Sequence, residues 1–235
     1  NCYFNVEGYN GAWVQIENIN PIPTSGTTKT YGSVSTYTKF RFTYTKNLGN
    51  VAFDDVQVNC GGCTVTSFPF TENFDGVNAP NLPCGWTMTN DNSDDKQWIT
   101  SIGFPNSGTN SMYIRKNTTL AMNDWFFTPK LVGLTAGTTY NISFYYRNAI
   151  SAKTEKLEVK WGSTPSAGGM TGGTIYTNAS ISNEGYLQAT GNFSPGSSGD
   201  YYIGFHGYSA LNQSELYIDD ISIITCAGAP SAPVE

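Results

Sequence analysis

Short runs in which apolar and polar residues alternate recur along the whole chain of 235 residues. Alternation places successive side chains on opposite faces of an extended backbone, so it predicts half-buried β-strands. Residues 39–45 alternate cleanly, with Phe40, Phe42 and Tyr44 on one side. Gly, Pro and Asn punctuate the runs, as they do in two packed antiparallel sheets. The predicted strands are 12–19, 39–45, 50–58, 68–74, 85–89, 111–116, 124–129, 139–148, 155–162, 185–193, 200–208 and 215–224, and 164–174 is predicted to be a flexible loop.

One strand pattern occurs twice. Residues 51–60 and 216–226 each carry two aspartates, followed by alternating β-branched residues that run to a cysteine. A repeat at about the spacing of one domain predicts two related β-modules in tandem, of which the first is cut short.

The repeat sets the predicted domain boundaries. Residues 1–59 form the C-terminal part of a β-sandwich, 60–67 a linker, 68–226 a complete module, and 227–235 a Pro/Ala-rich linker to a following module. The first part has too few strands to close a sandwich and would leave open edges. We therefore expect it to pack against strands that this stretch of sequence does not contain.

Composition narrows the class of protein. Only 13% of residues are charged, while Gly and Tyr are abundant, which favours an all-β fold. The net charge of −6 and the lack of a basic cluster argue against nucleic acid as a partner. No stretch approaches the roughly 20 apolar residues of a membrane-spanning helix. The N-terminal residues do not resemble a natural start, so we interpret the chain as a piece of a longer protein.

Five cysteines suit an oxidising compartment. Cys60-Gly-Gly-Cys63 has the spacing of a redox motif, but it lacks the βαβ setting of such motifs. It could also be half of a zinc site, yet no second pair lies near it. Linker disulfides are the favoured interpretation, and the sequence leaves the pairing open.

Three ordered motifs resemble a known family. They are residues 68–98, which contain Leu82-Pro83-Cys84-Gly85-Trp86; residues 124–147, with a Trp-hydrophobic-x-Thr-Pro pattern before a strand; and the closing strand around Tyr217-Ile218-Asp219-Asp220-Ile221. Over about residues 66–226 the chain resembles cleaved-adhesin domains, also called choice-of-anchor J domains. MAM domains share their plan and are the near relatives to exclude. Residues 1–59 resemble only the C-terminal half of such a domain.

This resemblance implies a jelly-roll β-sandwich of a secreted or surface protein. Such domains occur in the adhesin regions of gingipain proteases, bind calcium, and are thought to mediate adhesion to host proteins, glycans or cells. They also accompany secreted peptidases. Cys84 departs from the usual residue of the motif and suggests a local disulfide.

Acidic residues are the candidate ligands of a structural calcium ion. Glu72 shares a strand face with Phe70 and Phe74, and alternation places Asp219 on the face of Ile221 and Ile223. Two inward carboxylates would repel each other unless a cation joined them, and calcium prefers such oxygen ligands. The predicted ligands are Glu72, Asp75, Asp91, Asp94 and Asp219, with Asn92, Asp95 and Asp220 in reserve. The alternative is that residues 91–95 are solvated turn residues without a metal.

Catalytic signatures are weak. Two carboxylates at strand ends would permit a glycosidase, but the module is small for a substrate cleft. His206 lies on the strand face opposite Ile203 and Phe205, and no nucleophile motif accompanies it. We interpret it as a surface or packing residue. Tyr145, on the face opposite Phe144 and Tyr146, could stack on a sugar, although tyrosine also simply suits strands.

The sequence therefore predicts a non-catalytic, calcium-stabilised adhesion module, secreted or at the cell surface, that binds glycans or proteins. Two alternatives stay open. One is a structural repeat unit of a stalk or fibre, whose partners are neighbouring copies. The other is an accessory domain of a secreted protease or glycosidase.

Overall fold

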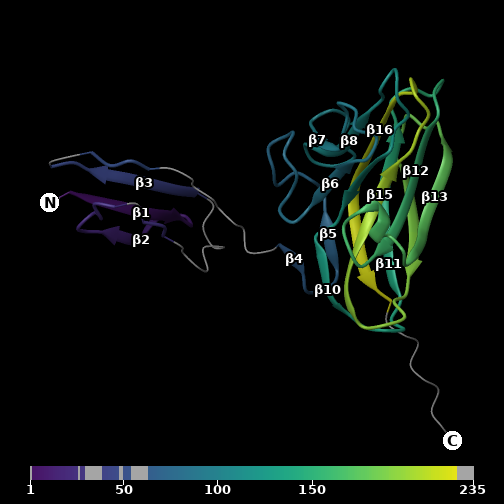
Figure 1. Ribbon diagram of the computed structural model, residues 1–235. Coiled ribbons are helices and arrows are strands. Elements are labelled where there is room, and N and C mark those ends of the chain that lie inside the picture. The colour runs from purple at the N-terminus through teal and green to yellow at the C-terminus, as the bar shows by residue number, and fades with distance from the viewer. Residues whose placement is uncertain (1, 26, 30–38, 48–49, 54–62, 227–235) are drawn as a thin grey trace, which may run out of the picture. The chain divides into compact units, whose positions relative to one another are not determined.

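The computed structural model describes residues 2–25, 27–29, 39–47, 50–53 and 63–226. The chain divides into two compact units, residues 1–62 and 63–235 (Figure 1). Regular structure in the described residues is almost entirely β-strand, so the predicted all-β class is confirmed. Residues 54–58 of the predicted strand 50–58, Cys60 and the predicted tail 227–235 lie outside the described residues, and residues 50–53 form no strand.

The first unit contains an antiparallel sheet of order β2-β1-β3. Its strands are β1 (Tyr3–Tyr9), β2 (Trp13–Ile19) and β3 (Lys39–Thr45). Along β1 the burial alternates, with Phe4 and Val6 buried. The prediction missed β1 because its third inward position is Gly8, which has no apolar side chain to continue the alternation of Phe4 and Val6.

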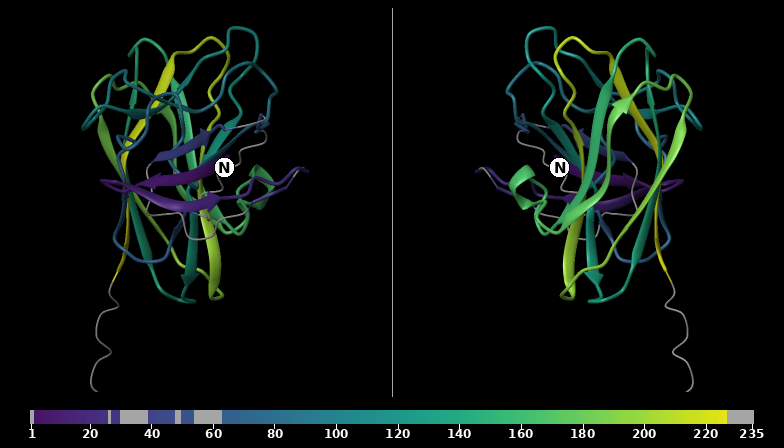
Figure 2. Two further views of the ribbon diagram at one scale, coloured as in Figure 1. Left: turned by 90° about the vertical axis from the view of Figure 1, so that its left-hand side faces the viewer. Right: turned by 90° about the vertical axis from the view of Figure 1, so that its right-hand side faces the viewer.

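The second unit is built from two larger sheets. One has the order β13-β12-β15-β10-β4, with β9 joining β15 to β6; the other has the order β14-β11-β16-β8-β7, with β5 also paired to β16. Figure 2 shows the long strands from two sides, and the turn η1 (Ala167–Gly169) projects beside them. The strands are β4 (Thr64–Val65), β5 (Phe70–Glu72), β6 (Thr87–Asn90), β7 (Ile99–Ser101), β8 (Ser111–Arg115), β9 (Asp124–Phe127), β10 (Lys130–Leu134), β11 (Tyr140–Asn148), β12 (Glu155–Gly162), β13 (Gly173–Ile181), β14 (Leu187–Phe193), β15 (Gly199–Gly207) and β16 (Glu215–Thr225).

One apolar core joins the two sheets. Phe126 of β9 and Phe205 of β15 stack with ring centroids 4.6 Å apart, and Phe144 of β11 meets Phe205 edge-on at 5.3 Å. All three side chains are fully buried. Phe205 therefore contacts the opposite sheet directly, which is the two-layer packing of the predicted sandwich.

Four strands of the second unit, β4, β7, β10 and β13, are not among the predicted strands. β13 begins at Gly173, inside the predicted loop 164–174, because Thr174–Ile181 pairs with β12 despite the glycines that precede it. β4 (Thr64–Val65) lies within the predicted linker 60–67 and pairs in parallel with β10. Residues of that linker from Cys63 onward thus belong to the second unit.

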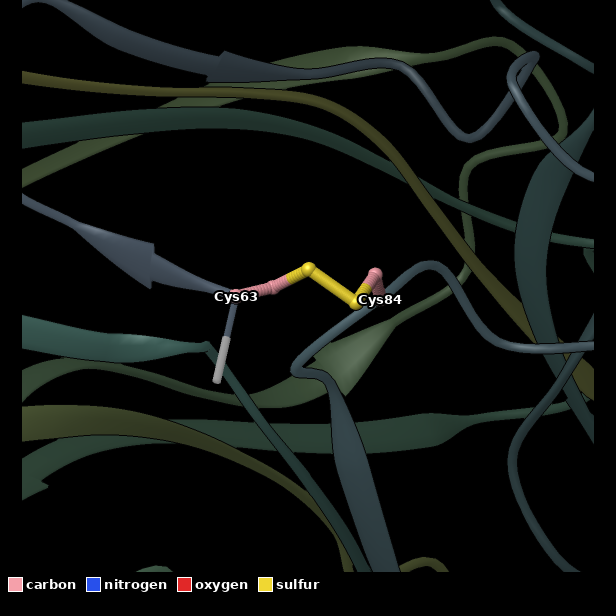
Figure 3. Close-up of a disulfide and its surroundings, with 2 residues drawn as sticks. All are labelled: Cys63 and Cys84. Carbon is pink, nitrogen blue, oxygen red and sulfur yellow. A yellow bond between two sulfur atoms is a disulfide. The ribbon is translucent and has the colours of Figure 1, made fainter. Parts of the chain in front are cut away.

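A disulfide joins Cys63 to Cys84 (Figure 3). The pairing ties the start of β4 to the turn of the Leu-Pro-Cys-Gly-Trp motif, so the local disulfide suggested for Cys84 is present. Gly85 is required beside it, because its φ is +81° and an added Cβ would lie 2.3 Å from the carbonyl oxygen of Cys63.

Replacing Phe126 by Ala should lower the free energy of unfolding by about 3–5 kcal/mol, because it removes a buried ring from between two sheets. Urea denaturation of the second unit measures this loss. Leu187→Ala, at a side chain that is 51% exposed, is the control and should change stability little. Equal effects of the two substitutions would contradict the described core.

Candidate functional site

A loop of residues 102–110 is held against the second unit by carboxylates of β16. Asp219 Oδ2 accepts hydrogen bonds from the backbone N–H groups of Asn106 (2.7 Å) and Ser107 (3.3 Å). Asp220 accepts from the side chains of the same two residues, at 2.7 Å from Asn106 Nδ2 and 2.6 Å from Ser107 Oγ. Two adjacent residues of one strand thus fix two adjacent residues of the loop.

Asp75, just after β5, holds the other end of the loop. Its Oδ1 accepts from the backbone N–H groups of Thr109 (2.6 Å) and Asn110 (2.9 Å). These bonds, led by that of Thr109, lower the pKa of the Asp75 carboxyl. Gly108 has a φ of +60°, and a Cβ there would lie 1.6 Å from Asp75 Oδ2. The carboxylate therefore occupies the space that any larger residue would need.

Asp219 is fully buried, as predicted, but the predicted face is wrong. Asp219 lies opposite Tyr145, whose side chain points away from the core. The pairing of β16 with β11 shifts between Asp219 and Ser222, and Asp220 has a φ of +48°. This β-bulge inserts one residue, so Ile218 and Ile221 both face the core while Asp219 faces the loop. Burial raises the pKa of Asp219 to about 7 despite its hydrogen bonds.

Glu72 lies on the core-facing side of β5, directly opposite Ile221, as its predicted face requires. Its Oε1 accepts from the backbone N–H of Phe74 at 2.7 Å. Burial raises the pKa of the Glu72 carboxyl. Glu72, Asp75 and Asp219 thus all have backbone N–H donors, which satisfy these oxygens without a cation.

The remaining predicted ligands form a second group, in the loop after β6. Asn92 Nδ2 donates to Asp94 Oδ2 at 3.2 Å, and Asp94 Oδ1 accepts from the backbone N–H of Lys96 at 2.6 Å. Asp95 is exposed and forms an ion pair with Lys96. No hydrogen bond within residues 63–226 connects this loop to Asp75, Asp219 or Asp220.

Asp124, at the start of β9, is a buried acidic residue that the sequence did not single out. It is fully buried, its Oδ2 accepts from the backbone N–H of Asn123 at 3.1 Å, and its Oδ1 has no hydrogen-bond partner. Burial, together with the charges of Asp94 and Asp91, raises the pKa of Asp124 to about 7. The available signal was an aspartate at the head of the aromatic run 125–127.

The donor set is incomplete as a metal cage. Among the residues that the structure describes, no three His, Cys, Asp or Glu side chains are grouped closely enough to hold a metal ion. Calcium also accepts amide and backbone oxygens, which the loop around Asp91, Asn92 and Asp94 offers in addition to Asp124. The unpartnered oxygen of Asp124 makes this second group the better fit for a cation.

Exposed apolar residues lie on the carboxylate-held loop. Ile102 is 77% exposed and Phe104 54% exposed. Beneath Phe104 the guanidinium of Arg147 lies 4.3 Å from its ring centroid, and Tyr186 Oη donates to the Phe104 carbonyl at 2.7 Å. We call residues 102–110 with Arg147 and Tyr186 the loop platform. Beside it is an open groove of about 630 Å³, whose lining includes Val77, Pro80, Thr100, Ile102 and Asn110.

His206 and the predicted outward tyrosine are accounted for as well. His206 stacks on Trp125 with ring centroids 4.2 Å apart, while its two nitrogens contact Glu158 Oε1 and Asn123 Oδ1, each at 2.8 Å. It is a packing residue, as predicted. Tyr145 lies on the outer face beside Asp219 and lines a smaller groove with Gln188.

Stability without calcium should fall as the pH rises from 4 to 8. Asp124 and Asp219 have a folded-state pKa of about 7, above the ordinary value of 3.8, so their contribution is complete below pH 4 and is lost as they ionise. Urea midpoints measured in chelator across this range test it. The double variant Asp124→Asn/Asp219→Asn should decline less than wild type, whereas Asp95→Asn should follow wild type; identical slopes for all three would refute the assignment.

Known adhesin domains share this fold. The K1 cleaved adhesin domain of Lys-gingipain from Porphyromonas gingivalis matches with a TM-score of 0.54 at 14% identity, covering 68% of this chain and 100% of that domain. The K2 domain of Lys-gingipain matches with a TM-score of 0.54 at 16% identity, over 67% of this chain and 99% of that domain. No profile of a known protein family and no curated protein matches the sequence. The predicted structural resemblance is confirmed, and at these identities it establishes the fold alone.

Proposed function

We propose that the second unit is a non-catalytic, calcium-stabilised binding module of a secreted or cell-surface protein, which adheres to a glycan or protein through the loop platform. The observation that carries the proposal is the exposure of Ile102 and Phe104 on a hydrogen-bonded loop beside an open groove. Exposed apolar side chains that are clustered and rimmed by polar residues are typical of recognition surfaces.

Preorganisation distinguishes this surface from a loose loop. Asp75 and Asp219 fix the loop backbone at residues 106–110, Asp220 holds the side chains of Asn106 and Ser107, and Arg147 lies against the ring of Phe104. A ligand that binds there meets side chains already in place, so less conformational entropy is lost on binding. The groove is lined by the exposed polar residues Asn78 and Thr109 next to apolar walls, a combination suited to a sugar ring or a short peptide.

The proposal of a non-catalytic role rests on how the candidate groups are used. The carboxylates beside the loop accept hydrogen bonds from its N–H groups, so their lone pairs are directed at the protein. His206 is held between Glu158, Asn123 and the face of Trp125. Protein groups therefore occupy the positions next to these carboxylates and His206 at which a substrate would have to bind.

An extracellular setting agrees with two further observations. Cys63 and Cys84 form a disulfide, which persists in oxidising compartments. The fold is shared with cleaved adhesin domains of Lys-gingipain. Within the described residues, no helix has both the length and the apolar character needed to cross a membrane.

Calcium is proposed at Asp124, with amide and backbone oxygens of the neighbouring loop around Asn92 as its further ligands. A cation would complete the unpartnered Oδ1 and offset the repulsion among three acidic residues. The role is structural, because it would fix the loop after β6 to β9. The earlier expectation of a calcium ion that joins Glu72 to Asp219 stays a prediction, and the hydrogen bonds of both groups give it less support.

Binding should depend on Phe104. The chain is applied to arrays of glycans and matrix proteins, in calcium and in chelator, as wild type, Phe104→Ser and the control Leu211→Ser, whose side chain is 49% exposed. We expect Phe104→Ser to weaken binding at least about tenfold, the effect of losing about 1.4 kcal/mol, and Leu211→Ser to leave it unchanged. A folded chain that binds nothing would contradict the proposal and favour a structural spacer.

Calcium should raise the unfolding temperature. At a concentration 100 times the dissociation constant, the gain is about 2.7 kcal/mol. Asp124→Asn should abolish the gain yet unfold no earlier than wild type in chelator, because it removes a buried uncompensated charge. Asp95→Asn should keep the full gain. A calcium response that survives Asp124→Asn and is lost in Asp219→Asn would move the ion to the other group.

A further inference from the structure

A second groove, of about 440 Å³, lies on the outer face of the sheet that contains β11 and β16. Its lining residues come from four neighbouring strands or their ends, in the order β5-β16-β11-β14. Strands of a sheet lie about 4.8 Å apart, so these four span about 14 Å. Asp220 lines this groove and also holds Asn106 and Ser107, so it lies between the groove and the loop platform.

Strand pairing places five polar side chains on one face there. Tyr145 alternates with buried core residues and points outward, and Gln188 of β14 is directly opposite it. Ser222 likewise alternates with buried residues, and it has Ser143 opposite on β11 and Thr71 opposite on β5. All five residues line the groove. We call it the sheet groove.

The hydrogen-bonding capacity of these five side chains is unused by the protein. Within the described residues, none of them donates or accepts a hydrogen bond through its side chain. Four carry a hydroxyl group and the fifth, Gln188, an amide, so each can both donate and accept. The carboxylates that hold the loop platform differ, because their oxygens already accept bonds from that loop.

The position of the groove excludes the commonest way in which a sheet binds a peptide. Strand addition needs a free edge with unpaired backbone groups. β11 and β16, which form the middle of the groove, are each paired on both sides. Only side chains are therefore available to a ligand, and they offer hydroxyl and amide groups around the ring of Tyr145. Sugars match this set, since their hydroxyls donate and accept while their C–H faces pack against an aromatic ring.

Charge narrows the class of sugar. Glu72 and Asp220 are the charged residues of the described lining, and both are acidic. An anionic sugar would be repelled by them, because like charges at short range raise the free energy of the complex. A neutral sugar avoids this repulsion.

We propose that the sheet groove is a second binding site, which takes a neutral oligosaccharide. The ring of Tyr145 stacks on one sugar, and the hydroxyls of Ser143 and Ser222 form hydrogen bonds with the hydroxyls of the chain. A ligand of several sugars fits better than a single one, because the polar residues are spread across four strands. The site is separate from the loop platform and does not rest on the function proposed for it.

Isothermal titration calorimetry of the full chain tests this site. The probes are soluble neutral oligosaccharides of glucose, xylose, mannose or galactose, with an oligosaccharide of galacturonic acid as the anionic comparison. We expect a neutral probe to bind and the anionic one to bind at least about tenfold more weakly. Tyr145→Ala should weaken binding at least about fivefold, through loss of stacking. The milder double variant Ser143→Ala/Ser222→Ala should weaken it about two- to tenfold, through loss of hydrogen bonds.

Two control variants separate this site from the rest of the molecule. Tyr208→Ala removes another half-buried tyrosine, just after β15 in the other sheet, and should leave the affinity for the oligosaccharide unchanged. Phe104→Ser removes the aromatic ring of the loop platform and should also leave that affinity unchanged.

Three results would overturn the proposal. The first is that the folded chain binds none of the neutral probes. The second is that binding survives both Tyr145→Ala and the double serine variant. The third is that binding is lost in Phe104→Ser alone, which would assign the sugar to the loop platform and support the function proposed there. Loss in Tyr145→Ala with full binding in Phe104→Ser supports the sheet groove, whether or not the loop platform has a ligand.

Discussion

The second unit depends on satisfying backbone N–H groups in a loop that covers the outside of a sheet. Residues 102–110 belong to no strand, so their backbone N–H groups have no neighbouring strand to which they can donate. A buried N–H group without an acceptor lowers the stability of the fold. Asp75 and Asp219 accept these bonds. Burial raises the pKa of the Asp219 carboxyl, because an ionised carboxylate is less stable when it is shielded from water. Residues 106–110 are held in place as a result, while Tyr186 and Arg147 contact the exposed Phe104.

Alternation predicted the faces of regular strands and failed where the backbone is irregular. Phe144 and Tyr146 face the core and Tyr145 faces outward, as predicted, because β11 follows strict two-residue periodicity there. The prediction for Asp219 failed because one inserted residue at Asp220 reverses every face beyond it. Asp124 was missed for another reason, since a buried acid is recognisable only once its neighbours are known.

Comparison within one chain extends what either unit shows alone. The first unit, taken by itself, is a three-stranded sheet with a half-covered aromatic face. In the second unit, β13, β12 and β15 have the same order, and the β12–β13 pairing shifts after Val159 as the β1–β2 pairing shifts after Val6.

The Cys63–Cys84 disulfide also has a mechanical consequence. A pull on the chain from the side of the first unit reaches the second unit through β4, a strand of two residues in parallel pairing with β10. So short a ladder would be peeled away bond by bond. The disulfide passes tension at Cys63 to the turn before β6. Strand β6 is paired along its length with β9. Load is then shared across the sheet, and β4 keeps its place while the molecule is under traction.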